Sequence, residues 1–323
     1  MSNSTGRITV LDAEPVSEDF LIEVVTGLSG SPRSLPCKFF YDEHGSNLFQ
    51  QICELPEYYI TRTETELLTR YGHEMADSIG AKARLIGFGT GAGVKTRMLL
   101  EHLEDPVAYV PVDISKQRLI DSAAQLSQAM PKLDIMPVCA DYLQLLELPH
   151  SRRKPDHTAV YFPGSTIGNL EPEVAGEFLH RICQLCGKNG GLLIGVDLQK
   201  DPAVLEAAYN DSAGVTAEFN LNLLVRINRE LHADFDLPLW RHQAIHNEYH
   251  GRVEMHLISE AKQTVHIGHN EFQFAPGEKI ITEFSYKHTE DGFAEFAASA
   301  GFHLARVWTD SRHWFAVFHF TVA

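Results

Sequence analysis

The chain has 323 residues, of which 44% are hydrophobic and 22% are charged, and its formal net charge is −16. This composition predicts a folded protein of one large domain or two ordinary ones. The negative charge argues against a nucleic-acid partner, because phosphate binding requires a basic surface. No run approaches the ~20 apolar residues of a membrane helix, and the first residues do not resemble a signal peptide. Together with five cysteines, an odd number, these features predict a cytoplasmic protein with reduced thiols and no membrane partner.

The first sixty residues predict little regular structure. Residues 1–17 are polar and are expected to be irregular, and a short helix is predicted at 20–25. Residues 28–61 are rich in aromatic side chains, proline and glycine, which suits a lid or a pocket wall better than a regular core element. A helix is predicted to follow, with Thr61 or Thr63 as its capping residue.

From residue 84 onward, apolar strands and amphipathic helices alternate. Such alternation predicts a parallel sheet with helices on both faces. Pro172 fits the first turn of the last helix in this region, and glycines follow its end. The expected strands are 84–87, 108–112, 135–139, 158–162 and 191–196, and the expected helices are 94–103, 115–129 and 171–186.

The pattern changes after residue 197. Helices are predicted at 202–210 and 218–234, antiparallel strands at 252–258, 263–267, 271–275 and 279–285, then a helix at 290–300 and strands at 303–308 and 313–321. A parallel sheet that ends in an antiparallel hairpin is typical of S-adenosylmethionine-dependent methyltransferases. We therefore predict an α/β, Rossmann-like class I methyltransferase domain from residues 62–198 and 288–323. Residues 1–61 and 199–287 would form a second, α+β domain over its active-site edge.

The most informative motif is a glycine-rich loop after the first strand of the predicted sheet. Gly87, Gly89, Gly91 and Gly93 alternate there, and the next strand ends at Asp113. Glycine lets the chain turn tightly and lets a ligand approach bare backbone, while an acid at the next strand tip can accept hydrogen bonds from ribose hydroxyls. These residues predict a nucleoside-containing cofactor. The loop also fits the dinucleotide fingerprint, so a nicotinamide dehydrogenase stays an alternative.

Residues after the third and fourth strands favour S-adenosylmethionine. Asp141 can accept a hydrogen bond from the exocyclic amine of adenine, and the ring of Tyr142 offers adenine a flat face. The small residues of 163–169 leave room for a reactive methyl group and its acceptor. Methyl transfer needs in-line geometry and a directed lone pair, which suits a site with Asn169, tyrosines and no obvious nucleophile.

Five segments of the chain resemble the histidine-specific Nα-methyltransferases of ergothioneine biosynthesis. They are KFFYD at 38–42, LPEYYITR at 55–62, GSTIGNL at 164–170, GVTAEFN at 214–220 and INREL at 227–231. The resemblance extends over about residues 18–321. It implies that three methyl groups pass from S-adenosylmethionine to the α-amino nitrogen of L-histidine, giving hercynine, in a two-domain enzyme with the substrate between its domains.

The resemblance also implies the site residues. Asn169, Tyr58 and Tyr41 would be catalytic; Tyr41, Gly89, Lys95, Asp113, Asp141 and Tyr142 would bind the cofactor; Tyr58, Gly164, Asn169, Tyr209, Met255, Glu283 and Ser285 would bind the substrate. Neutral imidazole offers one donor and one acceptor, so Glu283 and Ser285, two apart on one strand face, can hold it. Aromatic faces tolerate the quaternary ammonium that accumulates on the product. Met255 and Glu283 together favour histidine over tryptophan.

The chain departs from the family pattern at several positions. Gly87 stands where relatives carry a glutamate, and residues 92–94 replace a Ser/Glu-type sequence before Lys95. Tyr286 and Lys287 also differ from the expected residues. Two alternatives therefore stay open, namely the same chemistry on another amino acid such as tryptophan, and a ligand-binding paralogue without turnover. We expect a monomer with a small-molecule amino-acid substrate.

Two further patterns have the spacing of metal ligands. On a helix, His242, His246 and His250 would line one face and could bind zinc, and Cys183 and Cys186 form a CxxC pair. Such spacing arises easily in a chain with 17 histidines, and no second CxxC is present. We therefore favour a solvated histidine-rich surface and packed core cysteines, and predict no metal.

Overall fold

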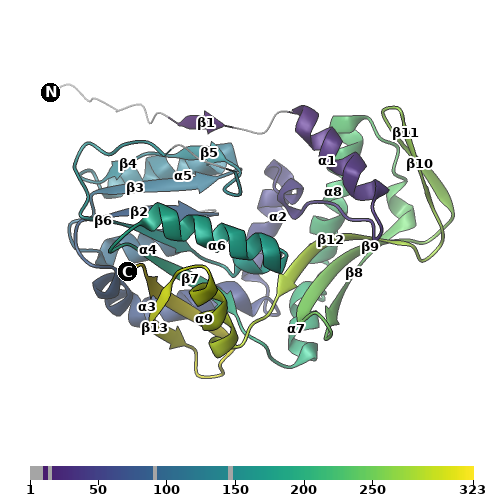
Figure 1. The fold of residues 1–323 in the computed structure, drawn as a ribbon. Coiled ribbons are helices and arrows are strands. Elements are labelled where there is room, and N and C mark those ends of the chain that lie inside the picture. Colours follow the sequence, from purple (N-terminus) through teal and green to yellow (C-terminus); the bar gives the residue numbers. More distant parts are fainter. Residues whose placement is uncertain (1–9, 14–16, 90–92, 145–147) are drawn as a thin grey trace.

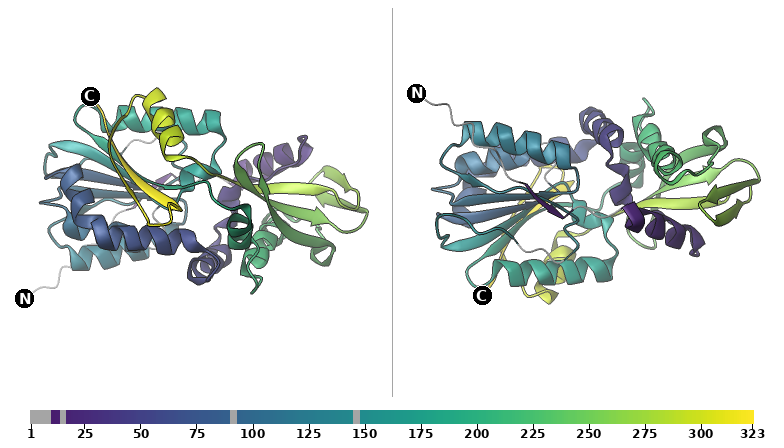
Figure 2. Two further views of the ribbon diagram at one scale, coloured as in Figure 1. Left: turned by 90° about the horizontal axis from the view of Figure 1, so that it is seen from below. Right: turned by 90° about the horizontal axis from the view of Figure 1, so that it is seen from above.

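The computed structural model describes residues 10–13, 17–89, 93–144 and 148–323. Their strands form one large sheet, a three-stranded sheet and a two-stranded ribbon, with the large sheet at one end of the molecule and the others at the opposite end (Figures 1 and 2). Within these ranges, every helix is too short or too polar to cross a membrane.

The large sheet has the order β1-β5-β3-β2-β6-β7-β14-β13, with β4 beside β3. All pairs are parallel except those of β14, which runs antiparallel to both β7 and β13. The predicted parallel sheet with a terminal antiparallel hairpin is thus confirmed. The strands are β1 Leu11–Ala13, β2 Ala83–Phe88, β3 Ala108–Asp113, β4 Asp134–Ile135, β5 Val138–Ala140, β6 His157–Phe162, β7 Gly191–Asp197, β13 His303–Thr309 and β14 Phe315–Thr321.

Helices cover both faces of this sheet, as Figure 2 shows. Because side chains alternate along a strand, Leu85 of β2 packs in the core beneath α3 and α4, whereas its neighbour Ile86 packs in the core beneath α6 and α9. The strands are therefore apolar on both faces, as buried parallel strands are. The helices around the sheet are α3 Tyr59–Ile79, α4 Val94–His102, α5 Lys116–Ala129, α6 Pro172–Cys186 and α9 Glu290–Ser299.

The smaller sheet has the order β12-β9-β8, and β10 pairs with β11 as a separate ribbon. All of these pairs are antiparallel. This confirms the prediction for the four expected strands, whereas β8 was not predicted. The strands are β8 Trp240–Asn247, β9 Arg252–Ser259, β10 Gln263–Ile267, β11 Asn270–Phe274 and β12 Lys279–Tyr286; the helices beside them are α1 Ser17–Ser29, α2 Glu43–Glu54, α7 Pro202–Tyr209 and α8 Val215–Leu231. Short 3₁₀ helices occupy Cys37–Phe40, Thr166–Asn169 and Leu237–Leu239.

Several expectations for individual elements were wrong. Within 1–17, residues Leu11–Ala13 form a strand that pairs with β5. The single strand expected at 135–139 is interrupted at Pro137, which has no N–H to donate to a ladder. The segment 28–61 contains the regular helix α2, whose capping residue is Asp42, with its Oδ1 2.8 Å from the N–H of Gly45.

Two helices begin earlier than predicted. Helix α3 begins at Tyr59, so Thr61 and Thr63 lie inside it and cap nothing, and the predicted domain boundary at 61/62 falls within this helix. Helix α8 begins at Val215 because the carboxylate of Asp211 accepts the N–H groups of Val215 and Thr216 at 2.9 and 2.8 Å.

Gly195 of β7 lies against α3 so closely that no side chain fits. A Cβ atom there would lie 2.4 Å from Oε1 of Glu64 and 2.9 Å from the ring of Phe315. We expect Gly195→Ala to lower the free energy of unfolding by about 1–3 kcal/mol, because a packed core resists extra volume. Gly176→Ala in α6 is the control, since its Cβ would meet only ordinary contacts at 3.6 Å. Urea denaturation compares the two, and equal stability of both variants would contradict the close packing.

Candidate functional site

The predicted cofactor residues lie at the carboxyl ends of neighbouring parallel strands. Gly89 follows β2, Asp113 ends β3, Asp141 follows β5 and Gly164 follows β6, so the sheet brings all four to one edge. Gly89 has φ +58°, and a Cβ atom there would lie 3.9 Å from both Tyr142 and the side chain of residue 166. The remaining loop positions, 90–92, including Gly91 of the predicted motif, lie outside the described residues.

Two carboxylates at this edge have defined partners. Oδ1 of Asp113 accepts the N–H of Ser115 at 2.9 Å. Asp141 is buried, and its Oδ1 accepts the N–H of Leu143 at 2.9 Å while its Oδ2 lies 3.1 Å from Nζ of Lys38. Lys38 also pairs with Glu23 of α1 at 2.8 Å. The sequence analysis did not predict that Lys38 would tie the N-terminal segment to this edge.

The ring of Tyr142 lies among aromatic side chains of the sheet and of α6. Its centroid is 6.0 Å from Phe88, 5.5 Å from Phe162 and 5.4 Å from Phe178. Burial raises the pKa of the Tyr142 hydroxyl well above its usual value. The ring is thus fixed by packing and stays neutral, which suits contact with a flat, uncharged base.

Lys95 reaches a buried carboxylate instead of solvent. Its Nζ forms an ion pair with Oε2 of Glu64, and the same oxygen accepts the N–H of Gly164 at 2.9 Å. Glu64 is 0% exposed. This contact joins α3, α4 and the turn after β6, where Gly164 (φ +78°) and Ser165 (φ +57°) are left-handed. Glu64 was missed by the sequence analysis, because nothing local marks its partner 31 residues away.

A chain of ring contacts, which we call the tyrosine wall, runs through Tyr41, Phe49, Tyr58 and Tyr209. The ring of Tyr41 lies 5.6 Å from Phe49, the ring of Tyr58 lies 6.3 Å from Phe49, and Tyr58 lies 6.2 Å from Tyr209. Burial, followed by nearby negative groups that include Glu283, raises the pKa of both Tyr41 and Tyr58 well above the usual value. Their hydroxyls therefore stay protonated at neutral pH.

The predicted imidazole-binding residues lie on β12 and its neighbour. Glu283 pairs across the sheet with Met255 of β9, and Ser285, two residues further along β12, accepts a hydrogen bond from the hydroxyl of Tyr209 at 2.7 Å. Glu283 is half-buried. Burial raises its pKa to about 7, although the charge of Lys287 opposes the shift.

Asn169 ends the 3₁₀ turn that packs against this strand. The turn approaches β12 so closely that a Cβ atom on Gly168 would lie 2.8 Å from the carbonyl oxygen of Tyr286. The side chain of Asn169 is half-buried and has no hydrogen-bond partner among the residues that the structure describes. It is thus available to a ligand, next to the strand that carries Glu283 and Ser285.

Behind Ser285 lies a buried charge cluster that the sequence analysis did not identify. The carboxylate of Asp197, at 0% exposure, accepts hydrogen bonds from the hydroxyl of Tyr59 at 2.8 Å, from Lys200 at 2.6 Å and from Lys287 at 2.7 Å. Burial would raise the pKa of Asp197, but the two lysines hold it below its usual value. Burial lowers the pKa of Lys200 to about 8.

The shifted pKa of Glu283 predicts a pH-dependent stability. Between its usual value of 4.5 and its folded value of about 7, the folded protein holds a proton that the unfolded chain has released. The contribution of Glu283 to the free energy of unfolding therefore falls as pH rises through this window. We expect Glu283→Gln to gain stability relative to the parent between pH 4.5 and pH 7. Urea denaturation of both proteins at pH 4.5 and at pH 7 measures this effect. If the variant and the parent differ in free energy of unfolding by the same amount at both pH values, the raised pKa of Glu283 is contradicted.

The histidine and cysteine patterns have structural roles. His242 and His246 lie on strand β8, so the helix that would align them with His250 is absent. His242 is not solvated as expected, because Nε2 lies 2.8 Å from the carbonyl of Tyr209 and Nδ1 lies 2.9 Å from the amide of Asn220. In the described ranges, no three His, Cys, Asp or Glu side chains could hold a metal ion. Cys183 and Cys186 are buried in the core, as predicted.

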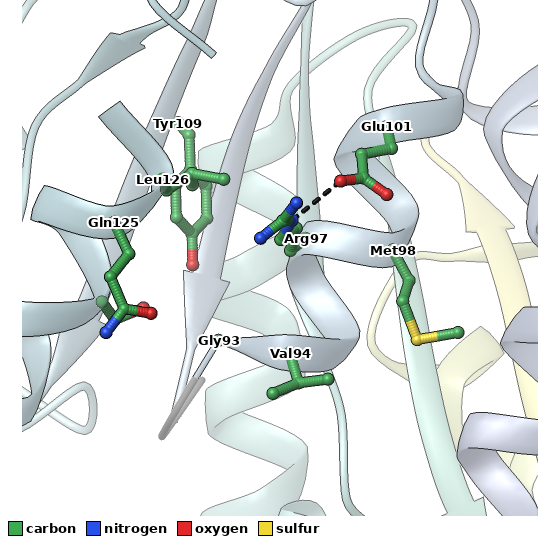
Figure 3. Close-up of a pocket in the computed structure, with 9 residues that line it drawn as sticks. Gly93, Val94, Arg97, Met98, Glu101, Tyr109, Gln125 and Leu126 are labelled. Carbon is green, nitrogen blue, oxygen red and sulfur yellow. Dashed lines mark hydrogen bonds and ion pairs between the residues drawn. The ribbon is translucent and has the colours of Figure 1, made fainter. Parts of the chain in front are cut away.

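A separate cavity of about 360 Å³ lies between α4 and α5 (Figure 3). Arg97 and Glu101 form an exposed ion pair on its α4 side. Its lining includes Gly93 of the glycine-rich loop but none of the individually predicted cofactor- or substrate-binding residues, so we do not assign it to cofactor or substrate. The lining residues are Gly93, Val94, Arg97, Met98, Glu101, Tyr109, Ser122, Gln125 and Leu126.

The strand order, the antiparallel β14 and the residues gathered at the strand ends define a class I S-adenosylmethionine-dependent methyltransferase fold. The family described as "Histidine-specific methyltransferase, SAM-dependent" matches residues 20–322. The chain belongs to this family, which confirms the resemblance found in the sequence motifs.

Individual relatives agree with the family match. The histidine N-alpha-methyltransferase of Mycolicibacterium smegmatis is 40% identical over 93% of this chain and 94% of its own. The histidine N-alpha-methyltransferase of Mycobacterium tuberculosis is 40% identical over 89% of this chain and 90% of its own. Ergothioneine biosynthesis protein 1 of Neurospora crassa is 28% identical over 96% of this chain but only 36% of its own length.

Proposed function

We propose that the protein transfers methyl groups from S-adenosylmethionine to the α-amino nitrogen of L-histidine, three times in succession, to give hercynine. The observation that carries the proposal is the position of Glu283 and Ser285. They lie on one face of β12, beside the tyrosine wall and the turn that carries Asn169. The histidine methyltransferases among the relatives support the same substrate.

We assign the cofactor to the strand-end edge. Asp113 would accept the ribose hydroxyls, Asp141 the exocyclic amine of adenine, and Tyr142 would lie against the adenine ring. A Cβ atom on Gly89 would lie 3.9 Å from the ring of Tyr142, so the glycine loop and the proposed partner of adenine are neighbours. Lys95 and Tyr41 would complete the site at the methionine end. When bound, S-adenosylmethionine supplies a methyl group on a positively charged sulfur.

We assign the substrate to the space between β12 and the tyrosine wall, with its amino end toward the cofactor. Glu283 would accept the imidazole N–H, Ser285 would bind the other ring nitrogen, and Met255 and Tyr209 would pack beside the ring. Asn169, Gly164 and Tyr58 would orient the carboxylate and the amine toward the sulfonium. Because burial keeps the hydroxyls of Tyr41 and Tyr58 protonated, they position the amine and do not remove its proton. The amine would lose that proton to water.

The remaining assignments follow from this proposal. The methyltransferase domain would comprise residues 62–198 and 288–323, and the substrate-binding domain residues 1–61 and 199–287. Helix α3 crosses the first of these boundaries and β1 joins the large sheet, so the two domains would share structural elements. We propose that the protein acts as a monomer in the cytoplasm.

Mass spectrometry of a reaction with S-adenosylmethionine and L-histidine tests the proposal. We expect products that carry one, two and three additional methyl groups. The same assay on a panel of twenty amino acids tests the tryptophan alternative. Tight histidine binding without product would support a ligand-binding paralogue, and binding of NADH would support a dehydrogenase. No methylated histidine at saturating cofactor would contradict the proposed activity.

A further inference from the structure

Lys287 lies at the centre of the polar cluster behind the proposed imidazole site. It is 3% exposed. Its Nζ lies 2.7 Å from Oδ2 of Asp197, 2.7 Å from Oγ of Ser285 and 3.2 Å from the hydroxyl oxygen of Tyr209. An ammonium group has three protons and no acceptor, so these three contacts use all of its donors. The position and direction of each proton are therefore fixed.

The hydroxyl of Ser285 can therefore act toward a ligand only as a hydrogen-bond donor. Its oxygen accepts one hydrogen bond from Lys287 and another from the hydroxyl of Tyr209, each at 2.7 Å. A serine hydroxyl has two acceptor positions and one donor, so both acceptor positions are occupied. Among the described residues, none accepts the Ser285 proton. Ser285 shares a strand face with Glu283, and its proton is thus available on the side where the substrate ring would lie.

We propose that Lys287 is a positioning residue that fixes Ser285 as an obligatory hydrogen-bond donor, so that the site selects a ring with both an acceptor and a donor nitrogen. This inference rests on the proposed function. Neutral imidazole meets both demands, since one nitrogen accepts from Ser285 while the other donates to the carboxylate of Glu283. Indole has a single N–H and no acceptor nitrogen. A bound tryptophan would leave the Ser285 proton without a partner in a desolvated site, which is unfavourable.

The counter-charge of Asp197 makes this arrangement possible. A buried lysine needs a nearby anion to stay charged, and the carboxylate of Asp197 is that anion for Lys287. The same carboxylate also accepts hydrogen bonds from Tyr59 and Lys200. Within the described residues, Lys287 links Asp197 to Ser285, both directly and by way of the Tyr209 hydroxyl. Substitution of Lys287 should therefore alter which rings are accepted, and not only how tightly histidine binds.

Calorimetry in the presence of S-adenosylhomocysteine tests this inference. The ligands are L-histidine and the pyrrolylalanines, which keep one ring N–H but lack the acceptor nitrogen. We expect Lys287→Met to lower the preference for histidine over pyrrolylalanine by about tenfold or more, because the Ser285 hydroxyl can then turn its proton away from a ring that offers no acceptor. In a Ser285→Ala background, the same change should not lower the preference further. An unchanged preference in Lys287→Met, or an additive loss in the double variant, would overturn the inference.

A second variant separates positioning from folding. Lys287→Met leaves Asp197 paired with Lys200 at 2.6 Å, and Lys200→Met is its control, because it removes the other lysine of the cluster and leaves Lys287 on Asp197 and Ser285. Thermal unfolding should show similar stability for the two variants, while only Lys287→Met loses preference for histidine. An equal loss of that preference in Lys200→Met would contradict the inference. If the unsubstituted protein binds no histidine at all, the proposed function fails instead.

Discussion

Replacing Glu283 by alanine should weaken the binding of L-histidine about tenfold to a hundredfold, because a hydrogen bond between a charged and a neutral group is lost from a desolvated site. Burial raises the pKa of this carboxyl to about 7, because an ionised carboxylate is less well solvated in this position than in water. A ligand that donates an N–H to it therefore replaces missing water, and isothermal calorimetry measures the loss directly.

Two controls make this experiment specific to the imidazole. S-adenosylhomocysteine should bind the Glu283→Ala variant as it binds the parent, because none of the proposed cofactor residues lies on β12. They lie at strand ends of the large sheet, on α4 and directly after the 3₁₀ helix Cys37–Phe40. Glu271→Ala, an exposed change on β11, should leave histidine affinity unaltered. Full histidine affinity in Glu283→Ala would rule out the assigned role of this residue.

Replacing Asp197 by alanine should lower the free energy of unfolding by about 3–5 kcal/mol, because removal of one member of a buried ion pair leaves charge uncompensated. Two lysines depend on this carboxylate, and the side chains of Lys200 and Lys287 are 3% and 0% exposed. Urea denaturation of the variant and of the parent measures the effect.

Glu101→Ala is the matched control for the buried cluster. Its ion pair with Arg97 has a similar distance of 2.8 Å, but the two side chains are 49% and 56% exposed. Pairs of this kind contribute about 0–1 kcal/mol, because solvent screens them. If Asp197→Ala lowers the free energy of unfolding no more than Glu101→Ala does, the buried cluster does not stabilise the fold as described.

The sequence was most informative where periodicity and topology combine. Regular alternation of apolar strands and helices predicted the parallel sheet, and the carboxyl ends of parallel strands necessarily share an edge. The sequence pattern therefore predicted Asp113 and Asp141 at the same edge as Gly89. The position of Gly89 followed from the same rule, since it directly continues β2.

Contacts between distant segments could not be predicted in this way. Asp197 and Lys287 are 90 positions apart in sequence, and Glu64 meets Lys95 from another helix. Strand β8 was missed because it is the edge strand of its sheet and buries only Trp240 and Ala244 fully, so its apolar alternation is weak. The histidine spacing on that strand then suggested a helical face that does not exist.

The most direct test of the whole account is a crystal structure with S-adenosylhomocysteine and L-histidine bound together. The account predicts adenine against Tyr142, the imidazole between Glu283 and Ser285, and the α-amino nitrogen directed toward the sulfur from beside Asn169. An imidazole bound away from Glu283, or an amino group directed away from the sulfur, would contradict it.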